Sequence, residues 1–173
     1  DEEASLCFAL RGPRGCASLR EMVTRDDQVV IVFSDITRPM PSDRVLPVIL
    51  KELEHVPREQ ITLLNALGTH RQNTSSELEQ MLGPEIVRNY RIIQHDAWNR
   101  DGLVYLGESG CGHPLWVNRE YQQATFRIVT GFIEPHIFAG FSGGPKAVLP
   151  GVAGIDTIMA NHSSSMLSSP KAT

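Results

Sequence analysis

Gln28-Val-Val-Ile-Val-Phe-Ser34 is the stretch that decides the fold. A continuous run of β-branched and aromatic residues, without the alternation of a half-exposed strand, is typical of a strand that is covered on both faces. Residues 35–41 follow as a loop that contains two prolines, and a helical pattern begins directly after it. A buried strand, a loop and a helix in this order indicate the start of an α/β domain.

The same order of strands and helices repeats along the rest of the chain. We predict further strands at 61–66, 90–95, 103–106 and 124–130, and helices at 19–24, 42–53, 74–81 and 154–161. Ser42 is the expected N-cap of its helix, and Gly83-Pro84 is expected to stop the next one. Elsewhere in residues 1–27 the pattern is weak. We therefore expect a single α/β domain over residues 1–173, with a mostly parallel, Rossmann-like sheet flanked by helices.

Composition excludes several classes of protein. The 173 residues carry a net charge of −4 with acids and bases mixed, which predicts no basic face for nucleic acid and no polybasic patch for a membrane. The longest apolar run, residues 29–33, is too short to span a bilayer. Cys7, Cys16 and Cys111 lack the spacing of a zinc site or a disulfide framework. The chain also opens with Asp-Glu-Glu and not with a basic segment, so we expect a cytoplasmic location.

Polar clusters follow three of the predicted strands, where α/β sheets bind their ligands. Asp35-Ile-Thr-Arg38 follows the first strand, Gly68-Thr-His-Arg71 the second, and Glu134 to His136 a third. Arg38 can hold a carboxylate or phosphate through two parallel hydrogen bonds, while Asp35 could orient that guanidinium or accept from a ligand hydroxyl. His70 and His136 have the side chain that suits acid/base work near neutral pH. The alternatives are an ordinary Asp–Arg ion pair and structural histidines.

The segment His136-Ile-Phe-Ala-Gly-Phe-Ser-Gly-Gly-Pro-Lys146 carries the most information. Its glycines let the backbone approach a ligand and expose amides to phosphate groups, and Lys146 supplies a charge or a nucleophilic amine. The alternative is a flexible surface loop with a solvated lysine. A Walker A loop, a GxSxG serine hydrolase motif and the GxGxxG of a nicotinamide dehydrogenase are all missing from the expected places. His162 follows the last helix, where it could also serve the helix dipole.

Taken together, these motifs resemble the lactate racemase family. The matching pieces are Ser34-Asp-Ile-Thr-Arg-Pro-Met-Pro-Ser42, Gly68-Thr-His-Arg71 with Glu77 after it, the segment from His136 to Lys146, and Pro150-Gly151 through Asn161-His162. Four ordered motifs with matching gaps cover roughly residues 28–165, and any one of them alone would be weak.

The resemblance implies a nickel-pincer nucleotide cofactor and a role for each matching residue. Lys146 matches the lysine that carries the cofactor through a covalent thioamide bond, next to Ser142, Gly143 and Gly144 as cofactor-binding positions. The remaining roles are implied in the same way: His162 as the nickel ligand, His70 and His136 as paired acid/base groups, Arg38 as the group that holds the substrate carboxylate, and Asp35 as its support.

The implied activity is the racemisation or epimerisation of 2-hydroxy acids by reversible hydride transfer to the cofactor. The implied partners are the 2-hydroxy acid, the cofactor-synthesis enzymes, and a C-terminal domain that these 173 residues lack. Without that domain we expect weak or absent turnover, and exposed apolar surface that favours a homo-oligomer. A second hypothesis is a nucleotide- or phosphate-binding module, in which the Gly-rich loop and Arg38 hold the ligand without catalysis. His55, His95 and His113 have no converging motif, and we interpret them as structural or surface residues.

Overall fold

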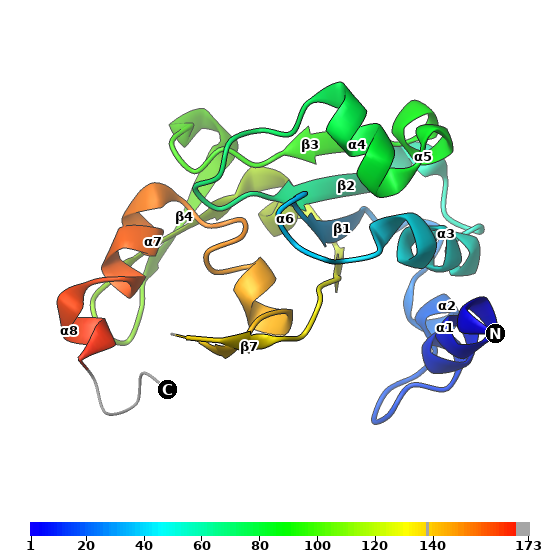
Figure 1. Cartoon of the computed structure of the whole chain (residues 1–173), viewed down its shortest axis with the longest axis horizontal. Helices are drawn as coiled ribbons and strands as arrows, with labels where there is room; N and C mark the ends of the chain where they lie inside the picture. The colour runs from blue at the N-terminus through cyan, green and yellow to red at the C-terminus, as the bar shows by residue number, and fades with distance from the viewer. Residues whose placement is uncertain (138, 169–173) are drawn as a thin grey trace.

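A four-stranded parallel sheet forms the centre of the molecule, which is described here by a computed structural model covering residues 1–137 and 139–168. The strand order is β3-β2-β1-β6, so β1 lies inside the sheet. Figure 1 shows helices on both sides of the sheet, which confirms the predicted α/β class. The strands are β1 (Val29–Ser34), β2 (Ile61–Ala66), β3 (Arg91–Gln94) and β6 (Phe126–Val129).

The side chains of β1 explain why this strand reads as an unbroken apolar run. Val29, Ile31 and Phe33 pack into one core with α3, α4 and α5. Val30 and Val32 point the other way and pack into a second core with residues from α6 and the 147–152 segment. Because both faces are covered, no position of the strand needs to be polar. The helices around these cores are α3 (Ser42–Glu52), α4 (Ser75–Leu82), α5 (Pro84–Asn89) and α6 (Arg119–Gln123).

Two N-terminal helices pack beside α3, and the sequence predicted only the shorter, α2 (Leu19–Met22). α1 (Glu2–Arg11) is held by ion pairs to α3, including one from Arg11 to the buried carboxylate of Glu52 at 2.8 Å. These partners lie far apart in the sequence, so a local pattern could not reveal them. The predicted N-cap role of Ser42 is wrong: Pro41 occupies the cap position, and Ser42 is buried as the first helical residue.

An antiparallel hairpin interrupts the parallel pattern between β3 and β6. It consists of β4 (Leu103–Glu108), which extends the predicted strand, and β5 (Pro114–Asn118), which the sequence analysis missed. The hairpin supports α7 (Ile155–Asn161), because the buried Thr157 hydroxyl donates to Pro114 O at 2.8 Å and accepts from Trp116 N–H at 2.7 Å. The helix predicted at 154–161 is therefore confirmed, and its position is set by β5.

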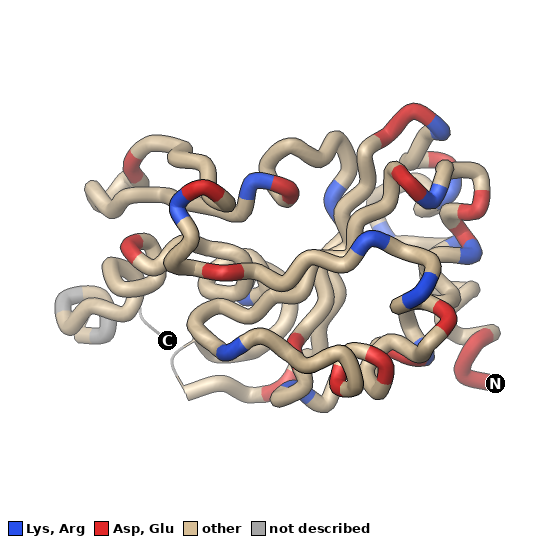
Figure 2. The backbone as a smooth tube through the Cα atoms, turned by 90° about the horizontal axis from the view of Figure 1, so that it is seen from above, with Lys and Arg blue, Asp and Glu red and all other residues tan. Residues whose placement is uncertain are grey.

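The last part of the described chain contains the short elements β7 (Pro135–His136), β8 (Gly140–Phe141), the 3₁₀ turn η3 (Gly144–Ala147) and α8 (Ser164–Leu167). Two further 3₁₀ turns lie earlier in the chain, η1 (Arg58–Gln60) directly before β2 and η2 (Arg100–Gly102) directly before β4. Figure 2 shows acidic and basic residues interspersed along the backbone. The three cysteines are free thiols. Within residues 1–137 and 139–168, no helix has the length and apolar character needed to cross a membrane.

Candidate functional site

One cavity of about 100 Å³ lies at the carboxyl edge of the parallel sheet. The loops after β1 and β2 form part of its wall, and the segment from Gly131 to Gly151 forms the rest. Six residues singled out from the sequence line it together: Asp35, Arg38, His70, Ser142, Gly143 and Lys146. They come from distant parts of the chain and meet because parallel strands end at the same edge.

A buried carboxylate orients His70. The His70 Nδ1–H group donates to Asp35 Oδ2 at 2.6 Å, and the other Asp35 oxygen accepts from the Thr37 hydroxyl at 2.8 Å. Asp35 is only 4 % exposed, so its carboxylate is committed to these two partners. The sequence predicts that Asp35 orients Arg38 or accepts from a ligand hydroxyl; in the structure its carboxylate contacts His70 and Thr37 and fixes the histidine tautomer. The Nε2 atom of His70 is left with a lone pair and can accept a proton.

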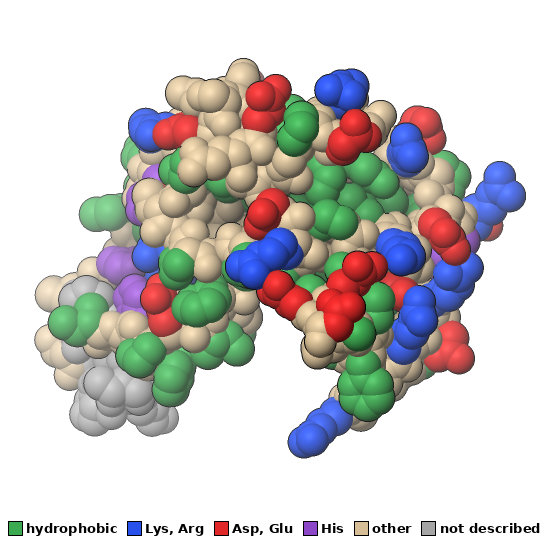
Figure 3. Space-filling view, turned by 45° about the vertical axis from the view of Figure 1, so that its right-hand side comes forward, with side chains coloured by type: hydrophobic (Ala, Val, Ile, Leu, Met, Phe, Trp, Pro, Cys, Tyr) green, Lys and Arg blue, Asp and Glu red, His purple; other side chains and the backbone are tan. Residues whose placement is uncertain are grey.

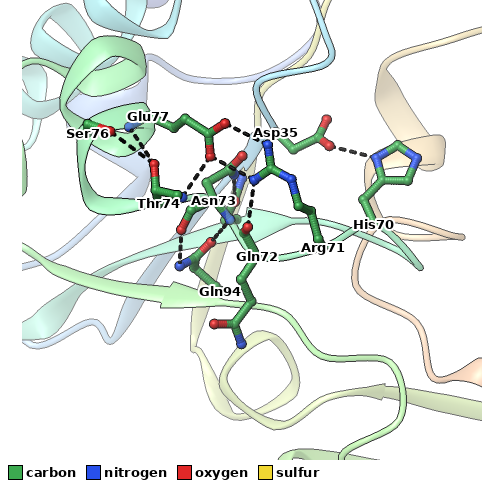
Figure 4. Close-up of polar contacts among 10 residues, drawn as sticks. Asp35, His70, Arg71, Gln72, Asn73, Thr74, Ser76, Glu77 and Gln94 are labelled. Carbon is green, nitrogen blue, oxygen red and sulfur yellow. Dashed lines mark hydrogen bonds and ion pairs between the residues drawn. The ribbon is translucent and has the colours of Figure 1, made fainter.

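The loop that carries His70 is anchored at both ends. At its start, the Gly68 N–H group donates to Gly151 O at 2.8 Å, which ties the loop to the segment containing Lys146. Figure 4 shows the other end, where Asn73 joins two amide side chains. Asn73 Nδ2 donates to the buried Asn65 Oδ1 at 2.6 Å, while its backbone N–H donates to Gln94 Oε1 at 2.6 Å.

A second clamp in Figure 4 holds the same loop from the outside. Arg71 donates to both carboxylate oxygens of Glu77, at 2.8 and 2.6 Å. Glu77 also accepts from the Thr74 N–H group at 2.7 Å, completing a capping box at the start of α4. The guanidinium of Arg71 and the Thr74 amide together lower the pKa of Glu77 to about 2. Sequence reasoning missed the roles of Asn65, Asn73 and Gln94, although an asparagine inside a buried strand was a signal that could have been used.

Lys146 lies half-buried in the cavity wall, on η3. Burial lowers the pKa of its ammonium group, and the positive charge of Arg38 lowers it further. Both effects favour the neutral amine. Among the ion pairs of the described residues, none includes Lys146. The chain therefore holds an amine beside a guanidinium, without a paired carboxylate to fix its charge.

The glycines and serine before Lys146 have mainly structural contacts. The Ser142 hydroxyl donates to Phe132 O at 2.7 Å and accepts from Glu134 N–H at 3.0 Å, so it holds the β7–β8 hairpin together. Gly143 has a φ of +76°, and a Cβ there would lie 3.1 Å from Ile133 Cγ1. Its backbone therefore faces the cavity at a place where a side chain does not fit. Gly144 has no neighbour within 4 Å of a built Cβ and does not line the cavity.

His136 and His162 lie near the cavity but do not line it. The pKa of His136 is lowered, first by burial and then by the charges of Lys146, Arg38 and His162, while Glu134 raises it. The side chains of Lys146, Arg38 and His162 are thus close enough to act on His136. The Nδ1 atom of His136 accepts from Ala139 N–H at 3.2 Å. Figure 3 shows histidine side chains gathered on one side of the molecule.

His162 follows α7 and presents one ring nitrogen to its surroundings. Its Nδ1–H group donates to Ile158 O at 2.9 Å, one turn back along the helix. This bond leaves the lone pair on Nε2, which is the arrangement that metal-binding histidines usually have. No group of three or more His, Cys, Asp or Glu side chains in the described residues could hold a metal ion. A metal at His162 would therefore need most of its donors from a bound molecule.

The sheet and this cavity define an α/β domain with a cavity at the carboxyl edge of a parallel sheet, where acid/base and amine groups lie together. The model of the lactate racemase N-terminal domain matches residues 1–173. The chain belongs to the lactate racemase family, as its N-terminal domain.

Relatives and solved structures agree with this assignment. The lactate racemase of Lactiplantibacillus plantarum is 41% identical over 172 residues, which are 99% of this chain and 41% of that protein. The lactate racemase of Thermoanaerobacterium thermosaccharolyticum is 37% identical and is covered over 40% of its length. The structure of its apoprotein superposes with a TM-score of 0.91 at 36% identity, over 99% of this chain and 42% of that one.

A protein from Thermotoga maritima has a more distant likeness, with a TM-score of 0.73 at 27% identity over 90% of this chain and 39% of that one. The chain thus spans about two fifths of the length of the relatives that it matches.

Proposed function

We propose that this chain is the cofactor-binding part of a racemase or epimerase of 2-hydroxy acids that uses a nickel-pincer nucleotide. The observation that carries the proposal is the Asp35–His70 pair in the same cavity wall as Arg38 and Lys146. A proton acceptor, a carboxylate-binding group and an amine are the three chemical elements that such a reaction needs from the protein.

The residues fit the proposed cofactor. Lys146 offers an amine with a lowered pKa, which suits covalent attachment, and the Gly143 backbone leaves room for a close approach. His162 would hold the nickel through the lone pair on Nε2, since its Nδ1–H group is occupied by the Ile158 carbonyl. When bound, the cofactor supplies the hydride acceptor, a chemistry that side chains do not offer.

The protein then binds the substrate and moves its hydroxyl proton. Arg38 pairs with the carboxylate of the 2-hydroxy acid and fixes the position of C2. His70 takes the hydroxyl proton at Nε2, and Asp35 stabilises the imidazolium that forms. His136 is the second acid/base group: its protonated ring can return a proton to the carbonyl oxygen, whereas the neutral ring can only donate a hydrogen bond or accept a proton. One histidine for each face of the planar 2-oxo acid would allow either enantiomer to react.

Further parts of the proposal concern partners of this chain. The greater length of the relatives supports a C-terminal domain that closes the cavity, and cofactor-synthesis enzymes would load Lys146. Ile133 and Phe141, next to the cavity, are 72 % and 64 % exposed, which supports a covering domain or a homo-oligomer. We expect weak or absent turnover by the 173 residues alone, and a cytoplasmic location.

The test is expression with the cofactor-making enzymes, followed by intact-mass and nickel measurements. We expect a covalent adduct on Lys146 and a loss of nickel in His162→Ala, with His113→Ala as the matched control that keeps it. Unchanged nickel in His162→Ala would contradict the ligand assignment. An unmodified lysine that binds nucleotide reversibly would favour the binding module without catalysis.

A further inference from the structure

Lysine is rare in this chain, and its distribution singles out one position. The sequence has only Lys51, Lys146 and Lys171. The Lys51 side chain is 61 % exposed and pairs with Glu3 at 3.3 Å, far from the cavity residues in the sequence. Lys171 lies outside the described residues. Of the two described lysines, only Lys146 lines the cavity at the carboxyl edge of the sheet, and among the ion pairs of the described residues none joins it to a carboxylate.

The surroundings of Lys146 resemble what a nucleophilic amine requires. Burial and the Arg38 charge both favour the unprotonated amine, which is the form that attacks a carbonyl carbon. An acid/base group lies in the same wall, since His70 keeps a lone pair on Nε2 through its bond to Asp35. Arg38 adds a group that pairs with a carboxylate. The cavity thus combines an amine, a proton carrier and a carboxylate-binding group.

We propose that Lys146 of the unmodified chain forms a reversible imine with small 2-oxo acids. Arg38 pairs with the carboxylate and brings the neighbouring C2 carbonyl to the amine. This goes beyond the proposed function, in which Lys146 carries the cofactor, because it concerns the chain before any cofactor is attached. A 2-oxo acid bound in this way would also compete with other reactions of the same amine.

The step balances without any added oxidant or reductant. The Nζ lone pair forms a bond to C2, and the carbonyl π bond opens to an alkoxide. His70 Nε2 takes one proton from Nζ and passes it to the alkoxide, which gives the neutral carbinolamine. The second Nζ proton then passes by way of His70 to the hydroxyl, which leaves as water while the nitrogen lone pair forms the C=N bond. The products are a C=N bond between C2 and Nζ and one molecule of water, so hydrolysis reverses the step.

Reductive trapping tests the proposal directly. The chain, produced without cofactor-making enzymes, is incubated with pyruvate and cyanoborohydride, which adds hydride to an imine and leaves a stable secondary amine. Intact mass counts the adducts, and peptide mapping assigns them among three lysines and the amino terminus. We expect one dominant adduct, on Lys146, at a pyruvate concentration that leaves Lys51 unlabelled. Labelling that follows exposure, with Lys51 or the amino terminus ahead of Lys146, would overturn the proposal.

Matched variants separate the parts of the argument. Lys51→Arg should label as the original chain does, and Lys146→Arg should lose the adduct. Arg38→Met should reduce labelling of Lys146 about tenfold or more, because a charge-assisted hydrogen bond to the carboxylate is lost. Acetone, a ketone of similar size without a carboxylate, should label Lys146 poorly in every variant. Equal labelling by acetone and pyruvate would refute the role of Arg38.

Peptide mapping of the trapped adducts on the original chain tests the proposal without any substitution, so the result does not depend on whether a variant folds. The outcome is also separable from the proposed function. A missing imine leaves cofactor attachment to Lys146 untouched, since that is read from nickel content and adduct mass after co-expression. A chain that never takes the cofactor can still form the imine.

Discussion

Replacing His95 with leucine tests how the hairpin and α7 are joined to the sheet. His95 is 1 % exposed; its Nε2 lies 2.9 Å from Ala153 O, and its Nδ1 lies 3.2 Å from Asn118 Nδ2. A neutral ring satisfies both contacts, with Nε2–H donating to Ala153 and Nδ1 accepting from Asn118. Leucine would fill a similar volume but leave both partners buried and unpaired, at about 1–3 kcal/mol each. We expect a loss of about 3 kcal/mol in the free energy of unfolding.

The same residue predicts a pH effect with a defined sign. Burial lowers the pKa of His95 below its usual 6.5, and this outweighs the opposing effects of the Ala153 carbonyl and Asp96. As the pH falls below about 6.5, the unfolded chain binds a proton at this position while the folded chain does not. The stability that depends on the neutral ring is therefore complete above that pH and is lost progressively below it.

Urea denaturation at pH 8 and at pH 5.5 measures both effects. The original chain should lose more stability between the two pH values than His95→Leu does, because leucine cannot titrate. His113→Leu, in the β4–β5 turn region, serves as the matched control and should change stability by less than about 1 kcal/mol. A His95→Leu chain as stable as the original at pH 8 would refute the hydrogen-bond argument. Equal pH dependence in the two proteins would refute the burial argument.

Three further changes should each give a measurable result. Gly151→Ala should destabilise the fold by about 3 kcal/mol or more, because the new Cβ would clash with the Ala147 carbonyl; an unchanged melting temperature would contradict this packing. Asn73→Ala should cost about 1–3 kcal/mol in urea denaturation, since a buried amide oxygen loses its donor; a neutral effect would mean that water replaces that donor. Glu77→Gln should speed hydrogen exchange of the Thr74 amide, because the carboxylate that accepts from this amide is lost. In the original chain the protection of the Thr74 amide should weaken as the pH falls from 4.5 towards about 2, the lowered pKa of Glu77. Protection that does not depend on pH would argue against the capping carboxylate.

Much of the fold follows from local patterns in the sequence, and the remainder depends on distant partners. The buried β1 run and the helical spacing after Ser42 were enough to predict a parallel α/β sheet. α1 escaped prediction because its stabilising contacts, such as Arg11 to Glu52, span about forty residues. β5 escaped because it has only five residues, begins with a proline, and pairs with β4 through a register shift.

The candidate site could be predicted in position better than in detail. Parallel sheets bind ligands at the carboxyl edge, and this rule was enough to predict from the sequence that Asp35, Arg38 and His70 lie close together; all three line the cavity. The partner of Asp35 could not be predicted, because both Arg38 and His70 are chemically acceptable and only the backbone path selects between them. The structural role of the Ser142 hydroxyl could not be predicted either, because its partners are backbone groups of the β7–β8 hairpin and no side-chain pattern in the sequence marks them.

Three histidines near the cavity show how neighbours assign different chemistry to one residue type. Asp35 accepts a hydrogen bond from His70 Nδ1–H, and the Ile158 carbonyl accepts one from His162 Nδ1–H, so each ring presents a lone pair on Nε2. His136 differs, because its Nδ1 accepts from the Ala139 amide and its neutral ring must carry the proton on Nε2. Two rings can therefore accept a proton or a metal at Nε2, and the neutral ring of His136 can donate a hydrogen bond from Nε2. This division follows from backbone carbonyls, an amide and one buried carboxylate, none of which the sequence around each histidine identifies.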